Sequence, residues 1–428
     1  MHITTHIRRP AVALAGTAAL ALTLTACAGG AGSSGSSSES GSGDGFAYDA
    51  PQEEVDAAIA DLDPITVTFQ GSAASQESVM APASTEFERI VEERSGGKID
   101  VEIVWGQAVA GYAEVHDALA DGRIDVAFTL PIYMPQEYPG VDAMGTALAG
   151  APPSPFMGEM VANAMANNLA WEDEELLANY DEKGLQPLTP VAASGGYYTV
   201  CTEPIVSVDD WQGRQVRIAG TAQAAQVTAM GGTPVSMDYT ETFEALQRGT
   251  VDCTLAQLVP SAEAGILEVA PHIGHMTDQS FSRAPGAYLA GKTFWDGLPL
   301  AYQQILFDSN AMASAGGMLA VIGGNADAMA QAKEHGGTVQ PFDSGVEDAV
   351  AETTGPLLES AVEAGNLPED IETRIEESVS GLESTFAELG YEDAGDTADF
   401  DEWFDWDTDF EGYARASYED AGLEHRPS

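Results

Sequence analysis

Hydrophobic and polar positions follow two different periods from Pro64 onward. Residues 65–70 (ITVTFQ) alternate as a β-strand does, whereas the apolar side chains of residues 79–97 have the spacing of an amphipathic helix. The first predicted elements are a strand at 65–70, a helix at 79–97, a strand at 99–105, a helix at 113–123 and a strand at 124–130. This order predicts parallel βαβ units and therefore an α/β fold.

The alternation continues through the second half of the chain, after a linker-like segment at residues 152–156 (PPSPF). The predicted elements are a helical run at 160–180, strands at 185–194, 195–201 and 214–220, helical residues between 217 and 231, one or two long helices at 295–330, a strand at 337–343 and helices at 346–389. Residues 118–128 (ALADGRIDVAF) and 245–255 (ALQRGTVDCTL) share a helix–turn–strand pattern. This similarity hints at two halves of related construction.

The N-terminal residues have the pattern of an export signal. Arg8 and Arg9 precede an Ala- and Leu-rich apolar run, and residues 24–27 (LTAC) close it in a way that resembles a bacterial lipobox. We therefore predict a lipoprotein signal peptide at residues 1–26, lipidation of Cys27, and a Gly/Ser-rich tether and leader at residues 27–63. The protein would then lie outside the cytoplasm, held at the cytoplasmic membrane by its lipid. The alternative is an ordinary secretory signal in which Cys27 has no role.

The charge balance limits the partners that the chain can have. It contains 16 Lys and Arg against 68 Asp and Glu, a net charge of −52. Nucleic acids and anionic membrane surfaces attract basic patches, so this balance argues against both as partners. A solvated acidic surface explains the bias without a specific site for an acidic partner. An anionic ligand is repelled at long range, so local positive groups must capture it.

Cys201 and Cys253 each end a predicted strand. In an oxidising compartment a disulfide between them would persist, provided that the two strands are adjacent. The alternative is a pair of buried thiols that pack as small hydrophobic side chains. The sequence leaves both interpretations open.

No sequence motif indicates catalysis or a cofactor. The chain has no G-x-S-x-G, H-E-x-x-H, P-loop or dinucleotide-binding motif. His272 and His275 lack further metal ligands at a suitable spacing. Alternating aspartates from Asp405 suggest a calcium loop, but Phe410 and Ala416 stand where such a loop needs Gly and Glu. We therefore expect no enzyme activity, no cofactor and no metal, and an acidic tail at 391–428 that docks on the body through Trp403, Phe404 and Trp406.

Several segments together resemble the solute-binding subunit of tripartite ATP-independent periplasmic (TRAP) transporters, the DctP family. They are FERIVEERSGGKIDVEIVWGQ (87–107), DALADGRIDVAF (117–128), VDDWQGRQVRIAG (208–220), AMGGTPVSMDYTETFEALQRGTVDC (229–253) and TFWDGLPLAYQQILFD (293–308). The resemblance implies a two-lobed α/β fold of the periplasmic-binding-protein type (type II-like), with crossing strands and a long connecting helix. The expected lobes are 64–194 plus 283–322 (lobe I) and 195–282 plus 323–390 (lobe II).

The resemblance also implies a function. Such proteins do no chemistry; they close like a hinge on a small organic acid and deliver it to membrane permease subunits that use an ion gradient. We expect the protein to act as a monomer in this role. The alternatives are a ligand-binding lipoprotein that feeds a membrane sensor and, with less support, an exported hydrolase.

Arg217, in WQGRQVRIAG, is the leading candidate for a ligand-binding residue. From the residues alone, an arginine here would be expected on an edge strand, paired with a surface carboxylate. In the resembled family, the arginine after the W-x-G turn and short strand binds the ligand carboxylate. A guanidinium suits this role because it presents a planar, bidentate fork and stays charged when desolvated. We predict that Arg217 binds the ligand, and that Arg214 is a surface charge.

The remaining site residues also follow from the resemblance. Some relatives carry a second arginine where this chain has Tyr197, so we expect one monocarboxylate with an apolar, hydroxylated or aromatic body, not a dicarboxylate or sialic acid. Tyr239 stands where relatives place an aromatic wall, although it would serve equally as a core residue. Gln70 matches a polar ligand contact at the end of the first strand. The other candidates are Gln257, Phe128 and Tyr133, the last two near the carboxyl end of a strand, where packing is an equal alternative.

Overall fold

The computed structural model describes residues 44–428 of the chain. Residues 44–428 belong to one compact unit. The predicted signal peptide, the predicted lipidation site at Cys27 and the Gly/Ser-rich part of the tether lie outside the described residues.

Strands and helices alternate through most of the described chain. The strands are β1 (Ile65–Gln70), β2 (Ile99–Val104), β3 (Val126–Thr129), β4 (Leu185–Ala192), β5 (Tyr198–Cys201), β6 (Gln215–Ile218), β7 (Thr233–Ser236), β8 (Cys253–Ala256), β9 (His272–His275), β10 (Gly286–Gly291) and β11 (Val339–Pro341). The α-helices are α1 (Gln52–Ile59), α2 (Pro82–Arg94), α3 (Val115–Ala120), α4 (Pro139–Ala147), α5 (Met157–Trp171), α6 (Glu174–Glu182), α7 (Val208–Trp211), α8 (Thr221–Ala229), α9 (Thr242–Gln247), α10 (Leu258–Glu263), α11 (Ile266–Val269), α12 (Lys292–Asp296), α13 (Leu300–Glu334), α14 (Ser344–Glu363), α15 (Ile371–Glu388), α16 (Phe400–Trp403) and α17 (Glu411–Asp420).

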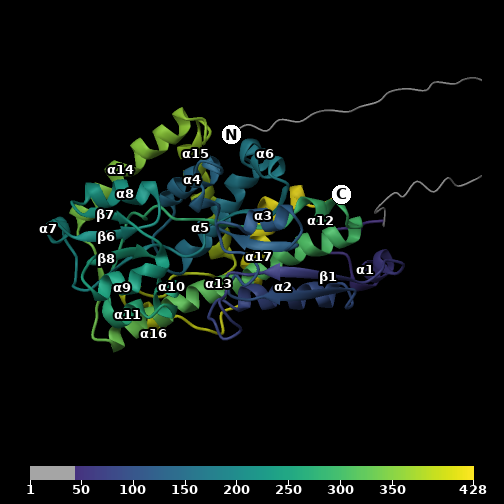
Figure 1. The fold of residues 1–428 in the computed structure, drawn as a ribbon, viewed down its shortest axis with the longest axis horizontal. Coiled ribbons are helices and arrows are strands. Elements are labelled where there is room, and N and C mark those ends of the chain that lie inside the picture. The colour runs from purple at the N-terminus through teal and green to yellow at the C-terminus, as the bar shows by residue number, and fades with distance from the viewer. Residues whose placement is uncertain (1–43) are drawn as a thin grey trace, which may run out of the picture. The chain divides into compact units, whose positions relative to one another are not determined.

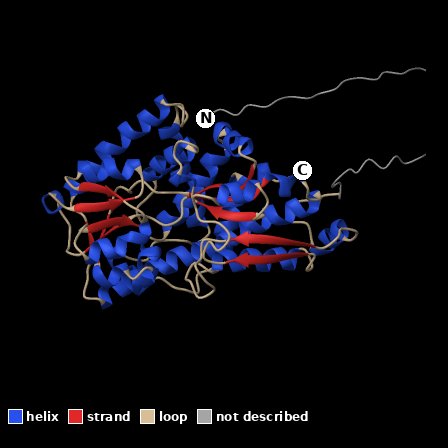
Figure 2. Cartoon of the chain, in the orientation of Figure 1, coloured by secondary structure: helices blue, strands red, loops and turns tan. Residues whose placement is uncertain are grey.

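The strands form two separate sheets, which Figure 2 shows as two groups of arrows. The first sheet has the order β2-β1-β3-β10-β4, and we call it and its helices lobe I. The second sheet has the order β11-β9-β5-β8-β6-β7 and belongs to lobe II. The predicted two-lobed α/β architecture is therefore confirmed.

Each sheet contains one strand that enters from the other lobe. The chain leaves β4 in lobe I and crosses to β5, which runs antiparallel to β8 and β9 in lobe II. It returns after β9 to β10, which runs antiparallel to β3 and β4 in lobe I. The other pairings are parallel. The predicted parallel βαβ units are therefore confirmed. The two antiparallel strands are the predicted crossing strands, each of which enters its sheet from the opposite end.

The repeated pattern of residues 118–128 and 245–255 has a common structural basis. In both segments a short helix ends at a glycine with positive φ, Gly122 at 76° and Gly249 at 68°. This left-handed conformation costs glycine little and any side chain more, so the helix stops and the chain turns into a strand. The strand is β3 in lobe I and β8 in lobe II, so the two lobes share this unit.

Helix α13 connects the lobes. It packs on α2 and β4 of lobe I and on α10, α11, β9 and β11 of lobe II, and Figure 1 shows it running between β1 and the strands of lobe II. Within residues 44–428 it is the only helix long and apolar enough to cross a membrane. However, 61% of its apolar window is buried in the protein, which is the behaviour of a core helix. The predicted long connecting helix is therefore one continuous helix.

Two predicted helical runs are divided. Asp173 accepts hydrogen bonds from the backbone N–H groups of Glu175 and Leu176, so it caps a new helix and separates α5 from α6. Gly365, with φ 77°, ends α14 before α15 begins. Helix α15 packs against α4 and α5, which belong to lobe I. This contact differs from the predicted boundary, which placed residues 323–390 in lobe II.

The C-terminal tail docks on the body. Phe156 of lobe I lies beside the rings of Trp403 and Phe404, with centroids 6.1 and 6.3 Å away. Trp406 is 44% exposed, although its ring covers Gly323 of α13. Near the end of the chain Arg426 pairs with Asp308 of α13 at 2.9 Å. The tail thus contributes to the core beside lobe I.

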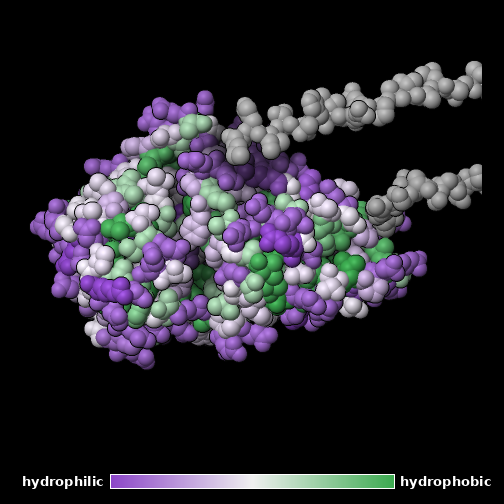
Figure 3. Space-filling view, in the orientation of Figure 1, coloured by the Kyte–Doolittle hydropathy of each residue, from purple (hydrophilic) through white to green (hydrophobic). Residues whose placement is uncertain are grey.

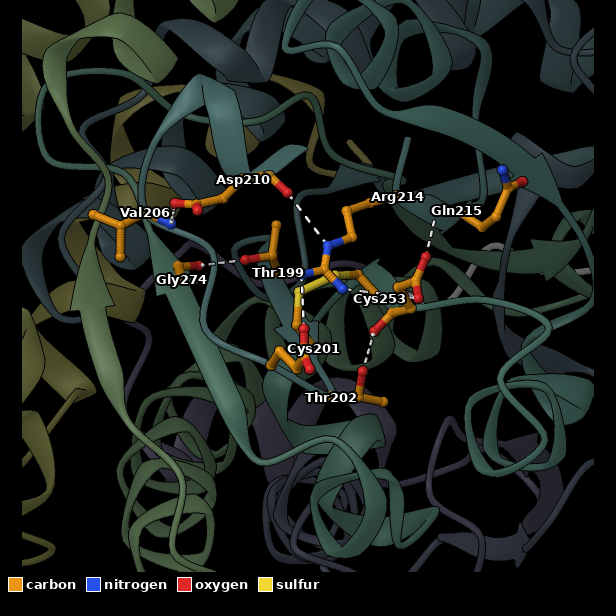
Figure 4. Close-up of a disulfide and its surroundings, with 11 residues drawn as sticks. Thr199, Cys201, Thr202, Val206, Asp210, Arg214, Gln215, Cys253 and Gly274 are labelled. Carbon is orange, nitrogen blue, oxygen red and sulfur yellow. Dashed lines mark hydrogen bonds and ion pairs between the residues drawn. A yellow bond between two sulfur atoms is a disulfide. The ribbon is translucent and has the colours of Figure 1, made fainter. Parts of the chain in front are cut away.

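Cys201 and Cys253 form a disulfide, shown in Figure 4. The two residues face each other in the antiparallel pairing of β5 with β8, and both are 1% exposed. Nearby, Asp252 accepts hydrogen bonds from the backbone N–H of Gln215 and the hydroxyl of Thr202. The crosslink therefore ties β5, the crossing strand, to its neighbour β8 in the sheet of lobe II.

Replacing both cysteines by serine is expected to lower the free energy of unfolding by about 4 kcal/mol, the chain-entropy estimate for closing a loop of this length. The cysteines are 52 positions apart, so the reduced chain has a large loop free to move when unfolded. Urea unfolding of the wild type and of the Cys201→Ser/Cys253→Ser variant measures the difference. As a control, reductant should leave the variant unchanged. Alkylation of two thiols in the unreduced, denatured protein would show that the bond does not form.

Candidate functional site

A cavity of about 700 Å³ lies between the two lobes. Side chains from β3, β4 and β10 of lobe I, from β6, β8 and α10 of lobe II, and from α13 line it. At its edge Ser78 Oγ of lobe I donates a hydrogen bond to Glu263 of α10 at 2.6 Å. The cavity is therefore bounded by the elements that would move relative to one another in a hinge motion.

Arg217 lies on the wall of this cavity, on strand β6. This strand pairs with both β7 and β8, so Arg217 is on an inner strand and only 3% exposed. Its Nε donates to the backbone carbonyl of Met237 at 3.2 Å, and its guanidinium carbon lies 5.1 Å from the ring centroid of Tyr239. These two contacts orient the guanidinium. The expectation of an edge-strand arginine paired with a carboxylate does not hold.

The ion pairing of the chain makes Arg217 exceptional. In residues 44–428, every lysine and arginine except Arg94, Lys98 and Arg217 forms an ion pair with a carboxylate. Arg94 and Lys98 donate instead to backbone carbonyls near the surface. Hydrophilic residues dominate the face in Figure 3, as the composition requires. A buried cation without a carboxylate is costly, so Arg217 is suited to receive an anion from outside.

Tyr239 is fixed beside Arg217 by lobe II. Its hydroxyl donates to Ser261 Oγ at 3.1 Å, and Ser261 donates to the carbonyl of Gln257 at 2.6 Å. Burial raises the pKa of Tyr239 well above its usual range, so the phenol stays neutral. Its ring faces the guanidinium, an arrangement that favours a cation. Gln257 precedes α10 and also lines the cavity.

Tyr197 lines the cavity from the segment that crosses from β4 to β5. Burial raises its pKa to about 12, and the positive charge of Arg217 acts in the opposite direction. The phenol is therefore neutral at physiological pH and offers a hydrogen bond without charge. Tyr197 thus places an uncharged group at the cavity wall.

Four aromatic side chains form the lobe I side of the cavity, and we call them the aromatic wall. They are Tyr112, Phe128, Tyr133 and Tyr288. Phe128 lies 5.2 Å from Tyr288 and 6.3 Å from Tyr112 between ring centroids, and Tyr112 lies 6.4 Å from Tyr133. Tyr133 is 47% exposed, so the wall reaches the solvent at that end. Such a surface is suited to the face of an aromatic or apolar ligand.

Gln70 does not reach the cavity. Its side chain is fully buried; Oε1 accepts hydrogen bonds from the backbone N–H groups of Val109 and Ala110, and Nε2 donates to the carbonyl of Ala110. The predicted ligand contact is therefore wrong, because the loop after β2 uses both ends of the amide. Gln70 holds in place the loop that leads to Tyr112.

The structure brings to the site residues that the sequence did not indicate. Tyr112 lies in a loop without periodicity, and Tyr288 lies on β10, the strand that crosses back to lobe I. Asp238 also lines the cavity, next to Tyr239. Hydrogen bonds from the backbone N–H and hydroxyl of Thr240 lower the pKa of Asp238, so it stays ionised. Their aromatic character was the only available signal for Tyr112 and Tyr288, and it does not distinguish a cavity residue from a core residue.

The crossing segments are held by a buried ion pair, which we call the hinge cluster. Arg283, just before β10, binds Glu159 of α5 at 2.6 Å, and both side chains are at least 97% buried. Glu159 also accepts hydrogen bonds from the backbone N–H of Gly196 and from Asn325 of α13. One carboxylate thus joins both crossing segments and the connecting helix. Glu159 thus neutralises the charge of Arg283, whereas no carboxylate in residues 44–428 pairs with Arg217.

The two histidines of the PHIGH segment have ordinary structural roles. They lie on β9, where His272 Nδ1 is 3.2 Å from Thr338 Oγ1 and His275 Nδ1 is 3.0 Å from the carbonyl of Met276. Burial lowers the pKa of each. Across residues 44–428, no group of three or more His, Cys, Asp or Glu side chains is placed to hold a metal ion.

Comparisons with known proteins identify the family of the chain. Residues 70–364 match the family described as bacterial extracellular solute-binding protein, family 7 (DctP). A solute-binding protein of Verminephrobacter eiseniae is 25% identical over 236 residues, which cover 55% of this chain and 67% of that protein. The C4-dicarboxylate-binding periplasmic protein DctP of Rhodobacter capsulatus is 24% identical over 242 residues, 55% of this chain and 68% of that protein.

A solved structure has the same fold. It is a TRAP solute-binding protein from a marine metagenome, described as specific for aromatic acid ligands and crystallised with 3-hydroxybenzoate. It superposes with a TM-score of 0.63 at 18% sequence identity and covers 75% of this chain and 98% of that chain.

These findings agree with the geometry of the cavity, which offers a binding surface and a cation. Proteins of this family are transport proteins that bind small solutes outside the cytoplasm and work with membrane permease subunits; they are not enzymes. The family match extends over more than half of the chain. The chain therefore belongs to the bacterial extracellular solute-binding proteins of family 7, the DctP family of TRAP transporter receptors.

Proposed function

We propose that this protein captures a small organic monocarboxylate between its lobes and delivers it to a TRAP permease for uptake driven by an ion gradient. The observation that carries the proposal is Arg217, a buried cation on the cavity wall without a carboxylate partner in residues 44–428. A ligand carboxylate would accept two parallel hydrogen bonds from the guanidinium. In a chain of net charge −52, this local fork provides the attraction that the surface lacks.

The cavity favours one carboxylate over two. Arg217 is the only lysine or arginine among the cavity-lining residues of the described chain, whereas Glu114, Asp238 and Glu263 also line it. A second ligand carboxylate would meet neutral or negative groups and would lose its hydration without compensation. The Rhodobacter capsulatus relative is described as binding C4-dicarboxylates and the marine structure as specific for aromatic acids. The single cation and the aromatic wall support an acid with an apolar or aromatic body.

A thermal-shift screen tests this function. The panel contains 3-hydroxybenzoate, benzoate, succinate and galactonate, with 3-hydroxybenzamide as the uncharged match for the first. A ligand that binds only the folded state stabilises it by about 4 kcal/mol at a thousandfold excess over Kd, so a true ligand raises the Tm clearly. We expect a monocarboxylate to raise the Tm and its amide to have little effect. A response to neutral sugars or metal ions alone would contradict the proposal.

We further propose that the mature protein begins at a lipidated Cys27 and acts as a monomer on a Gly/Ser-rich tether. The LTAC motif and the low-complexity residues after it support this placement. A tether lets the folded body meet its permease while the lipid keeps it at the membrane. Membrane fractionation of the wild type and of Cys27→Ala decides the question. Equal release of both into the soluble fraction would contradict lipid anchoring.

A further inference from the structure

The cavity continues far beyond Arg217 along one face of α13. The helix residues that line it are Phe307, Asn310, Ala311, Ala313, Ser314, Gly317, Met318, Val321 and Asn325. Most of them are spaced by three or four positions, so they share one side of the helix. Because an α-helix rises about 1.5 Å per residue, the lined stretch is about 27 Å long. This length is much greater than that of a single aromatic ring.

The far end of the cavity is enclosed by other elements of lobe I and by the tail. We call this part the rear arm; its walls are Asn163, Ala164, Asn167 and Trp171 of α5, Leu188, Thr189 and Val191 of β4, Phe307 and Asn310 of α13, and Tyr413, Ala414, Ser417 and Tyr418 of α17. The part that contains Arg217 and the aromatic wall is the front chamber. The lining residues of β4 extend from Ala192 near the crossing segment to Leu188 in the rear arm, with Pro190 not among them.

The rear arm combines apolar walls with neutral hydrogen-bonding groups. Asn310 Nδ2 donates to Thr189 Oγ1 at 2.9 Å, and Asn310 is 8% exposed. The amide oxygen of Asn167 is buried without a hydrogen-bond partner in residues 44–428, and so is that of Asn325 nearer to the front chamber. Buried polar atoms without partners are uncommon and costly, so these two amide oxygens are suited to accept a hydrogen bond from a ligand. No charged side chain is among the residues of the rear arm.

We propose that the ligand is an elongated monocarboxylate. Its carboxylate binds Arg217, its apolar body passes the aromatic wall and the small residues of α13, and a neutral hydrogen-bonding end, a hydroxyl or an amide, enters the rear arm. This inference rests on the proposed function of the front chamber. A charged distal end is excluded because the rear arm offers no opposite charge and burial of an unpaired ion is costly.

Titration calorimetry with terminally hydroxylated straight-chain acids tests the length of the site. The probes are hydroxybutyrate, hydroxyoctanoate and hydroxydodecanoate, each with its hydroxyl on the last carbon. We expect Kd to fall by about two- to fourfold for each added methylene, as burial of a methylene predicts, until the arm is filled. The Ser314→Leu variant adds bulk on the cavity face of α13 between the two parts and should remove this gain, so that Kd no longer falls as the chain lengthens.

A second variant tests the chemistry of the rear arm. Thr189→Val/Asn310→Leu replaces a hydrogen-bonded pair by apolar groups of similar size, a change that the fold tolerates better than the loss of one partner. It should weaken binding of hydroxydodecanoate by about tenfold relative to dodecanoate, as the loss of a buried hydrogen bond predicts. The melting temperature without ligand shows whether each variant is folded.

Three outcomes separate this inference from the proposed function. A length-dependent gain that Ser314→Leu abolishes supports the rear arm. Binding of short acids that does not improve with length overturns it and leaves the function of Arg217 intact, with water filling the arm. Absence of binding for every acid, with Arg217→Ala indistinguishable from the wild type, overturns both.

Discussion

Arg217→Ala is expected to weaken binding of the carboxylate ligand by about 2–5 kcal/mol, the range found when one partner of a buried charge pair is truncated. The guanidinium is 3% exposed and is oriented by the carbonyl of Met237 and the ring of Tyr239. Among residues 44–428 no other lysine or arginine lines the cavity, so no neighbouring cation replaces it. Arg217→Lys should also bind weakly, because an ammonium group cannot present the planar fork. Titration calorimetry with the ligand identified by thermal shift measures both effects.

The matched control is Arg214→Ala. Arg214 lies three residues earlier, where it pairs with Glu203 at 2.8 Å with 28% of its side chain exposed. We expect its loss to leave affinity unchanged, because a partly exposed ion pair contributes little and Arg214 does not line the cavity. If Arg217→Ala and Arg214→Ala bind equally well, Arg217 has no role in capture.

The stability of ligand-free Arg217→Ala separates a binding role from a structural one. The folded protein buries this cation without a carboxylate, which costs free energy that ligand binding then recovers. Removal of the charge should therefore leave the Tm of the ligand-free protein unchanged or raise it. A large decrease in Tm would show that Arg217 mainly supports the fold.

Glu159→Ala is expected to lower the free energy of unfolding by about 3–5 kcal/mol, because it leaves the buried charge of Arg283 without a partner. The same substitution removes the acceptor for Gly196 and Asn325. These contacts join the crossing segments to α13, so the variant should also lose affinity for ligand through a less defined hinge. Urea unfolding measures the stability, and calorimetry measures the binding.

Two comparisons control this prediction. Glu244→Ala breaks an exposed pair with Arg248 on α9 and should cost only about 0.3–0.5 kcal/mol. The double variant Glu159→Leu/Arg283→Met removes both charges and should recover much of the lost stability, since no ion remains unpaired. If Glu159→Ala and Glu244→Ala cost the same, the hinge cluster does not stabilise the fold.

The local features of the chain could be predicted from its sequence. The period-two and helical patterns located many of the strands and the longer helices, because burial on one side of an element requires that spacing. They gave no prediction for β7, β10 or α1. The order of segments around Arg217 indicated the family, and with it the residue that we propose to bind the ligand. The positions of Cys201 and Cys253 in two predicted strands indicated where a crosslink would form if the strands were adjacent. In the structure Cys201 ends β5, whereas Cys253 begins β8.

Only the tertiary structure decided which distant segments meet. Arg283 and Glu159 are 124 positions apart in the sequence. The residues next to Arg283 in the sequence do not show that its charge is paired, so only the structure distinguishes it from Arg217. Gln70 stands at the predicted place but turns its amide to the loop after β2. The aromatic wall and the rear arm depend on how β10, α13 and α17 pack against lobe I. Periodicity indicates that a side chain is buried, whereas its partners depend on the arrangement of whole elements. In residues 44–428 that arrangement places Arg217 on the cavity wall without a carboxylate partner.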